Sequence, residues 1–294
     1  MAVDVELVRL LLESKHLGVS FRKCLTLGRQ HYFASQGETR LLFQRHGIDP
    51  AEHPDLFSGE GREFADQFWT ALGSAELQTI DASDYEGASI IHDLSLPIPK
   101  SLQESFECVC DVGTLEHVFN FPVAIRNCME MVRPGGHLLL YTPANNFLGH
   151  GLYQFSPELF FRVLSPANGF KIERMIAVEY SPWRRRYEAL DPAVHRRRWA
   201  HVNKYRLLLF VQASRERVVP ILETPPQQSD YAALWTESQS KAVESSTPAH
   251  RESSWKRVLL EQAPRLARWL EAIRYSSWSP RCSLRDAASF RRTD

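Results

Sequence analysis

The stretch FECVCDVGTLEHV, residues 106–118, decides the fold. Residues 108–112 form a continuous apolar run, which is typical of a strand that is buried on both faces. A helical pattern over 122–132 follows, and RPGG at 133–136 then gives a stop-and-turn signal before another apolar run at 137–142. Strand, helix and strand in this order predict a βαβ unit of a parallel sheet.

The same alternation extends outward from Arg22 to Ser214. It predicts an α/β fold, Rossmann-like and doubly wound, with a mostly parallel seven-stranded sheet and helices on both faces. We expect strands at 23–27, 77–80, 89–92, 108–112, 137–142, 171–178 and 205–211, and helices at 36–46, 62–72, 122–132 and 156–164.

Composition divides the 294-residue chain into four parts. Residues 1–20 read as an amphipathic N-terminal helix, and residues 21–222 as the α/β domain. Residues 223–252 are rich in Pro, Gln, Ser and Glu, which predicts a disordered linker. Residues 253–294 hold an amphipathic helix and tail, and we expect this helix to pack on the domain or on a partner.

Charge and cysteine content narrow the class of protein. The 35 basic and 35 acidic residues balance, which argues against a nucleic-acid partner, and no apolar run approaches the length of about 20 residues that a membrane span needs. The five cysteines are scattered, without a CxxC pair. We therefore expect no metal site and no disulfide, and a reducing cytoplasm as the location.

Polar residues and glycines stand where the predicted strands end. They are Gly28, Asp81, Asp93, Gly113 and Thr114. Open α/β sheets bind ligands outside the carboxyl ends of their strands. Two carboxylates there suit an adenosine, because one can accept hydrogen bonds from the ribose hydroxyls and the other from the adenine amine.

At these positions the chain resembles the class I S-adenosylmethionine-dependent methyltransferases, especially their small-molecule group. The resemblance covers about residues 20–215 and is carried by motifs in order: Ile80-Asp81 at the second strand, His92-Asp93-Leu94 after the third, LEHV at 115–118, Arg133-Pro134-Gly135-Gly136 before the fifth, and Gly169-Phe170 before the sixth.

The resemblance implies S-adenosylmethionine as cofactor and assigns residues to it. Asp81 would hold the ribose, and Asp93 with Leu94 would frame the adenine. Gly113 and Thr114 would lie along the methionine part, with His117 at the start of the helix beside it. The other interpretation of His117 is a packed, hydrogen-bonded histidine without a ligand.

The loop after the first strand departs from the family, which has several glycines there. Here Gly28 is followed by Arg29 and Gln30. One interpretation is a modified cofactor site, in which Arg29 or Gln30 meets the cofactor carboxylate. The alternative is that the cofactor site has decayed.

The segment 142–155, which leaves the fifth strand, is our candidate for the acceptor side. His150 stands between glycines and is the candidate catalytic base. Asn145, Tyr153 and Phe155 are candidate substrate-binding residues. A surface loop with a structurally bonded histidine is the alternative.

Two arginine triplets, 184–186 and 196–198, lie between the last two predicted strands. Clustered guanidinium groups can bind phosphate or carboxylate, so an anionic substrate or partner is one interpretation, and a solvated face is the other.

These observations predict a methyltransferase that acts on a small-molecule or glycan-type acceptor, with O- or N-methylation left open. The alternative is a catalytically silent methyltransferase fold that serves as a binding or scaffold protein. A nicotinamide-dependent dehydrogenase is disfavoured, because G-x-G-x-x-G is absent.

Overall fold

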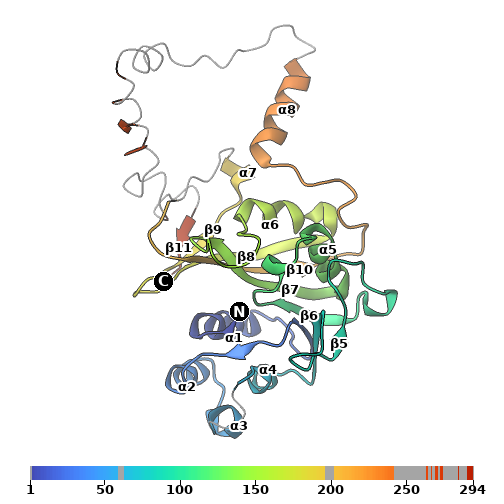
Figure 1. Ribbon diagram of the computed structural model, residues 1–294, viewed down its shortest axis with the longest axis vertical. Helices are drawn as coiled ribbons and strands as arrows, with labels where there is room; N and C mark the ends of the chain where they lie inside the picture. The colour runs from blue at the N-terminus through green and yellow to red at the C-terminus, as the bar shows by residue number, and fades with distance from the viewer. Residues whose placement is uncertain are drawn as a thin grey trace.

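One large mixed sheet organises the molecule, as the computed structural model in Figure 1 shows. The structure describes residues 2–58, 63–195 and 202–241, together with positions 263, 266, 269–270, 272–273, 284 and 290–293. The main sheet has the strand order β5-β4-β2-β6-β7-β10-β8-β9-β11, and β1 pairs separately with β3.

The elements follow the predicted order. The strands are β1 (Ala2–Val3), β2 (Lys23–Leu27), β3 (His31–Tyr32), β4 (Glu76–Asp81), β5 (Ile90–Ile91), β6 (Phe106–Asp111), β7 (Val132–Asn145), β8 (Phe170–Glu179), β9 (Arg186–Ala189), β10 (Leu207–Arg215) and β11 (Phe290–Arg292). The helices are α1 (Val5–His16), α2 (Gln36–Arg45), α3 (Pro54–Phe57), α4 (Asp66–Ala71), α5 (Phe121–Met131), α6 (Pro157–Val163), α7 (Pro192–His195) and α8 (Ser229–Lys241), with 3-10 turns η1 (Pro50–Glu52), η2 (Lys100–Leu102), η3 (Leu115–His117) and η4 (Pro166–Asn168).

The sheet confirms the predicted Rossmann-like class and corrects the number of strands. Strands β5, β4, β2, β6 and β7 are parallel, and β10 runs antiparallel between β7 and β8. Two further strands extend the edge: β9 forms inside the arginine-rich connection, and β11 comes from the far end of the chain. Sequence periodicity missed both because each is only three or four residues long.

Helices cover both faces of the sheet. In Figure 1, α1, α2, α3 and α4 lie below the sheet, and α5 and α6 lie above it. Alternate residues of β6 supply the two cores, since Val109 packs with the α5 side while Cys108 and Cys110 pack with the α1 side. Both thiols are buried, as predicted, and Cys24, Cys108, Cys110 and Cys128 are free cysteines.

The predicted N-terminal helix forms and belongs to the packed domain. Asp4 caps α1 by accepting a hydrogen bond from the backbone N–H of Leu7 at 2.9 Å. Leu7 and Leu11 are buried against the sheet. The helix predicted at 62–72 is shorter than expected: α4 begins at Asp66, because Glu63 and Ala65 instead bond to the backbone of the β2–β3 segment.

The RPGG turn lets β7 approach β6 closely. A Cβ atom on Gly136 would lie 2.7 Å from the carbonyl oxygen of Glu107, a distance that real side chains do not reach. Glycine at this position is therefore required by the close backbone contact rather than by a positive φ.

The C-terminal part differs in places from its predicted disorder. Residues 229–241 form α8, and Ser229 donates a backbone hydrogen bond to Glu158 of α6 at 2.9 Å. Residues 242–252, and most of the helix expected near Trp255 to Ile273, lie outside the described residues. Linker and tail boundaries therefore remain predictions.

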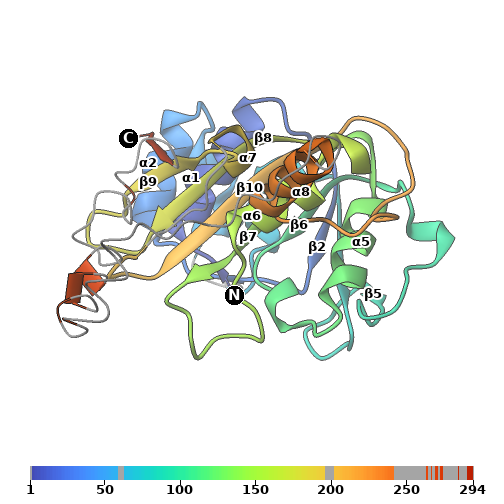
Figure 2. The same ribbon diagram turned by 90° about the horizontal axis from the view of Figure 1, so that it is seen from above.

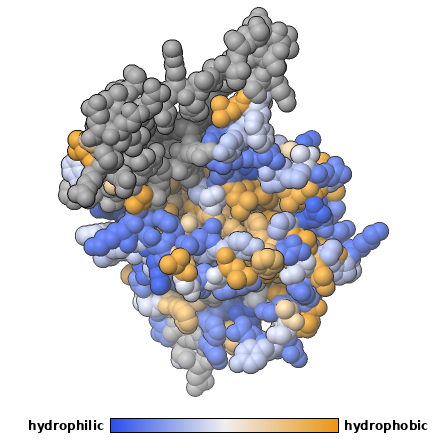
Figure 3. All heavy atoms as spheres, turned by 45° about the horizontal axis from the view of Figure 1, so that its top comes forward, coloured by the Kyte–Doolittle hydropathy of each residue, from blue (hydrophilic) through white to orange (hydrophobic). Residues whose placement is uncertain are grey.

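Hydrophobic side chains are exposed in the middle of the face that Figure 3 turns toward the viewer. Tyr231, Leu234 and Trp235 of α8 are among the exposed large apolar residues.

Within the part of the chain that the structure describes, no helix combines the length and apolar character that a bilayer crossing needs.

One ion cluster joins α1 to the sheet, and it predicts the acid sensitivity of the fold. The Glu13 carboxylate accepts from Arg174 of β8 at 2.9 Å and from Arg186 of β9 at 2.7 Å. Burial opposes ionisation of Glu13, but the hydrogen bonds and charges of Arg186 and Arg174 outweigh it, so the pKa of Glu13 is lowered from 4.5.

We expect Glu13→Gln to lower the free energy of unfolding at pH 7 by about 1–3 kcal/mol, the range for hydrogen bonds to charged groups. Because the pKa of Glu13 is lower in the folded state, its ionised carboxylate stabilises the fold at pH values above 4.5. This stabilisation is lost as the pH falls through the pKa of the folded state. The difference in the free energy of unfolding between wild type and variant, measured with urea, should therefore become smaller below pH 4.5. Glu52→Gln, an exposed control, should change little, and a gap that stays constant down to pH 3 would contradict this assignment.

Candidate functional site

The connection order of the sheet reverses between β2 and β6. From β2 the chain passes to β4 and β5 on one side, and then crosses to β6 and β7 on the other. The register pairs Leu27 with both Ile80 and Asp111, so these strands end level with one another. A reversal of this kind leaves a crevice outside the carboxyl ends of the strands, where doubly wound sheets bind ligands.

Three of the predicted cofactor residues meet at this reversal. A Cβ atom on Gly28 would lie 3.3 Å from Oγ1 of Thr114 and 3.5 Å from Oδ2 of Asp81. The Thr114 hydroxyl donates to the carbonyl of Leu27 at 2.9 Å, which ties the β6 turn to the end of β2. Gly28 has φ +66°, in the left-handed region that favours glycine.

Asp93 and Leu94 follow β5, one strand further out, and have different surroundings. Asp93 is exposed, and its carboxylate accepts from the backbone N–H of Ser95 at 2.8 Å. Leu94 is buried, and its carbonyl accepts from the Asn127 side chain at 3.0 Å. Asp93 is therefore available to a ligand at this edge, while the Leu94 side chain belongs to the core.

The loop after Gly28 is closed by side chains rather than by further glycines. Gln30 is buried, and its amide donates to the carbonyls of Leu27 at 2.8 Å and Gly28 at 2.6 Å. Its neighbour Arg29 forms an ion pair with Asp66 at 3.1 Å and lies over the ring of Phe64. The guanidinium of Arg29 is thus engaged away from Gly28, and we assign it no direct contact with the cofactor.

A buried carboxyl group shapes the turn that follows β6. Asp111 is 1% exposed, and its Oδ1 accepts from the backbone N–H groups of Thr114 at 2.8 Å and Leu115 at 3.3 Å. Burial raises the pKa of Asp111 to about 6, although these hydrogen bonds act in the opposite direction. Gly113, between strand and turn, has φ +91°.

Glu116 is a second buried acid beside Asp111. It is fully buried, and among the residues that the structure describes neither of its carboxyl oxygens has a hydrogen-bond partner of good geometry, although the Thr142 hydroxyl lies nearby. Burial first, and then the charge of Asp111, raise the pKa of Glu116 to about 8. Without a bound cation, the protonated form of this carboxyl group is therefore favoured.

Two histidines complete this group. Nε2 of His150 lies 3.4 Å from Oε1 of Glu116, and the rings of His117 and His150 meet edge to face, 5.0 Å between centroids. Burial lowers the pKa of both imidazoles, and their neighbouring charges, His150 for His117 and Arg206 for His150, act in the same direction. Both rings are therefore neutral at pH 7.

The acceptor segment places its three other predicted residues in different surroundings. In Figure 2 this loop, between β7 and α6, projects beyond the sheet. Tyr153 is half-buried and donates its hydroxyl to the carbonyl of Phe119 at 2.7 Å. Phe155 is 3% exposed, with its ring 4.6 Å from that of Phe121, so it is a core residue and does not line a substrate site. Asn145 donates to Asn203 at 2.8 Å.

Exposed apolar side chains surround the same edge of the sheet. Tyr85 is 91% exposed in the loop after β4, Phe119 is 79% exposed after η3, and Leu148 is 95% exposed after β7. All three loops follow the carboxyl end of a parallel strand, the edge at which doubly wound sheets bind ligands.

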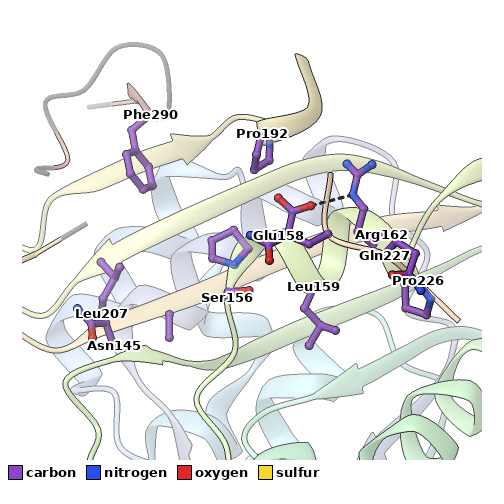
Figure 4. Close-up of a pocket in the computed structure, with 13 residues that line it drawn as sticks. Asn145, Ser156, Glu158, Leu159, Arg162, Pro192, Leu207, Pro226, Gln227 and Phe290 are labelled. Carbon is purple, nitrogen blue, oxygen red and sulfur yellow. Dashed lines mark ion pairs between the residues drawn. The ribbon is translucent and has the colours of Figure 1, made fainter. Parts of the chain in front are cut away.

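A cavity of about 550 Å³ lies elsewhere, beside α6 (Figure 4). Glu158 and Arg162 of α6 line it and form an ion pair at 3.4 Å, and Leu207 and Phe290 close the other side. Asn145 is its one lining residue among the predicted site residues. The cavity thus lies at the carboxyl end of β7, on the α6 side, and Gly28, Asp81 and Thr114 do not line it.

The arginine triplet at 184–186 is engaged in structural contacts. Arg184 lies over the ring of Tyr180 and 3.8 Å from Asp4, and Arg186 pairs with Glu13. These contacts favour a structural role over an anion site. The triplet at 196–198 lies outside the described residues.

The strand order now decides the fold family. Strands β5, β4, β2, β6 and β7 are parallel and β10 is inserted antiparallel before β8, which agrees with the predicted Rossmann-like, mostly parallel sheet and adds its strand order. The fold is that of the class I methyltransferases.

Comparison with known proteins gives distant matches. No family profile and no curated protein matches the chain. Among solved structures, the chain is similar to the 1,6-didemethyltoxoflavin N1-methyltransferase of Burkholderia thailandensis, solved with S-adenosylhomocysteine, at 12% identity and TM-score 0.39, covering 72% of this chain and 78% of that one. The chain is also similar to a putative S-adenosylmethionine-dependent methyltransferase from Listeria monocytogenes, at 12% identity and TM-score 0.37. The match covers 70% of this chain and 98% of that one. The branched-chain polyamine synthase of Thermus thermophilus is similar at 12% identity and TM-score 0.36, covering 76% of this chain and 59% of that one.

Sequence reasoning gave no role to two residues of this site, Asp111 and Glu116. Both belong to the stretch that fixes the fold, so each was visible only as part of a motif. A signal was present: an acid next to a histidine directly after a buried strand places two ligand-type side chains at the edge where the cofactor is expected.

Gly28→Ala should lower the free energy of unfolding by about 1–2 kcal/mol, because a left-handed φ is costly for any residue with a Cβ. The new methyl group would also press on Thr114 at 3.3 Å. Urea unfolding followed by tryptophan fluorescence measures the change. Gly37→Ala is the matched control, since nothing lies within 4 Å of its Cβ position and helix propensity favours alanine. Equal stability of the two variants would contradict the close approach at Gly28.

Proposed function

We propose that this protein is an S-adenosylmethionine-dependent methyltransferase that acts on a small-molecule acceptor. The observation that carries the proposal is the meeting of Gly28, Asp81 and Thr114 at the point where the strand order reverses. A glycine next to a carboxylate and a hydroxyl leaves space for a nucleoside and offers an acceptor for its ribose.

In this proposal each strand end holds one part of the cofactor. Asp81 accepts hydrogen bonds from the ribose hydroxyls, and Asp93 accepts from the adenine amine above the backbone of Leu94. Gly113 and Thr114 lie along the methionine part, with His117 beside it. Methyl transfer is an in-line displacement at sulfur, so positioning of the two reactants is the main task of the protein.

The acceptor side follows from the loop after β7. His150 reaches the same edge as Thr114 through its contact with Glu116, and Tyr153 stands nearby on this loop. Exposed Phe119 and Leu148 offer apolar surface to an acceptor. A small molecule or a glycan-type intermediate fits this arrangement, and the free cysteines support a cytoplasmic setting.

One observation favours a second candidate, a catalytically silent binding protein. The Gln30 amide bonds to the carbonyls of Leu27 and Gly28 and replaces the family's glycine-rich loop with a closed one. Such a protein would bind the cofactor weakly or not at all.

Calorimetric titration with S-adenosylhomocysteine tests the proposal. We expect binding, and we expect Asp81→Ala to weaken it by about 1.5–3 kcal/mol, as for the loss of charge-assisted hydrogen bonds. Asp84→Ala changes an exposed carboxylate of the same loop and should leave affinity unchanged. Absence of both heat and thermal shift at millimolar ligand would exclude the enzyme and favour the silent protein.

A further inference from the structure

The Glu116, His117 and His150 side chains form a compact set of potential metal ligands. One oxygen of Glu116 and one ring nitrogen from each histidine all lie within 4.8 Å of one another. They come from η3 and from the loop after β7, two segments that are far apart in the sequence. Two imidazoles and one carboxylate are a ligand set that proteins use for Zn²⁺, Mn²⁺, Fe²⁺ and Co²⁺.

Glu116 gives an independent reason to place a ligand here. Its side chain is fully buried, yet within the described residues neither oxygen has a hydrogen-bond partner of good geometry, with the Thr142 hydroxyl as its polar neighbour, and Nε2 of His150 beside it also lacks one. Leaving a buried polar group without a partner costs about 1–3 kcal/mol. The oxygens of Glu116 and Nε2 of His150 face each other at 3.4 Å, so one cation between them would bond to both.

The backbone holds the two segments in this position. The carbonyl of Glu116 accepts from the N–H groups of Leu152 at 2.7 Å and Tyr153 at 3.1 Å. Gly151 makes this approach possible, because a Cβ atom there would lie 2.9 Å from Cγ and 3.0 Å from the carbonyl oxygen of Glu116. The ligand set is thus fixed by main-chain contacts rather than by its own side chains.

The buried thiols of Cys24, Cys108 and Cys110 also lie within 4.8 Å of one another. They lie inside the sheet core, each at most 1% exposed, so a bound ion there would have no open side. His117, in contrast, is exposed, and the histidine set opens to solvent at the edge that carries Thr114.

We propose that Glu116, His117 and His150 bind one divalent transition-metal ion at the acceptor side of the sheet edge. The site departs from the sequence expectation of no metal, which rested on the cysteines. Three protein ligands leave coordination positions open, as in catalytic sites. Arg206, over the ring of Phe147 at 5.3 Å, is a cationic side chain near His150 and favours a bound anion or acceptor oxygen on the open side.

The consequence for the reaction rests on the proposed function. An acceptor hydroxyl bound to the metal loses its proton to water more readily, because the cation stabilises the alkoxide. The alkoxide oxygen then forms a bond to the methyl carbon as the carbon–sulfur bond breaks and its electron pair stays on sulfur. The products are a methyl ether and the uncharged thioether S-adenosylhomocysteine. His150 acts here as a ligand and not as the general base.

Metal titration of tag-free, chelator-treated protein tests the site without any cofactor. We expect one equivalent of Zn²⁺ or Mn²⁺ to bind by calorimetry, and Co²⁺ to give a visible absorption band from nitrogen and oxygen ligands. His117→Ala and His150→Ala should each weaken binding at least tenfold. His53→Ala, in the segment between η1 and α3, is the control and should bind as wild type does.

Two further variants separate metal binding from folding. Glu116→Gln removes the ligand charge but keeps the side-chain size, so the metal-free protein should melt at or above the wild-type temperature while metal no longer raises its melting temperature. Gly151→Ala should weaken metal binding by displacing the loop from Glu116.

Two results would overturn the proposal. One is the absence of stoichiometric binding of all three metals. The other is equal affinity of His150→Ala, His117→Ala and His53→Ala. The metal-site proposal and the methyltransferase proposal can be told apart by these measurements. If the protein binds metal but does not bind S-adenosylhomocysteine, the metal site is retained and the methyltransferase proposal is excluded.

Discussion

The Asp111 carboxylate is the interaction on which the edge of the sheet depends. It accepts hydrogen bonds from two backbone N–H groups and so holds the sharp turn that follows β6. That bend sets Thr114 against Leu27 and Gly28, and it places Glu116 under the loop that carries His150. A buried acid is costly to desolvate, and the two hydrogen bonds from the backbone offset part of that cost. The proposed cofactor side and the proposed acceptor side are therefore two ends of one turn.

Features that follow from hydrophobic periodicity, and from the residues at which strands end, could be predicted from the sequence. Apolar runs and their terminators located β2, β4, β6 and β7, and parallel register then brought Gly28, Asp81 and Thr114 together without further assumptions. Side-chain direction within loops was not predictable in this way. Phe155 reads as an exposed aromatic beside an acceptor loop, yet it packs on Phe121, because the loop turns back onto α5 and α6.

Contacts between distant segments were the other limit. The meeting of Glu116 with His150 depends on two backbone hydrogen bonds and the missing side chain of Gly151, and none of these has a local pattern. Gln30 shows the same limit in the first loop. Its long polar side chain suggested contact with a ligand, but the amide caps two carbonyls at the end of β2 and stabilises a loop that has one glycine.

Strand β11 places the far end of the chain at the margin of the sheet. Residues 290–292 pair with β9, which itself pairs with β8, so the outer edge of β9 is covered by a segment distant in sequence. Bare strand edges are templates for pairing between molecules and hence for aggregation. With β11 in place the edge strand is three residues long and carries two arginines, and short, charged edge strands are poor templates for such pairing.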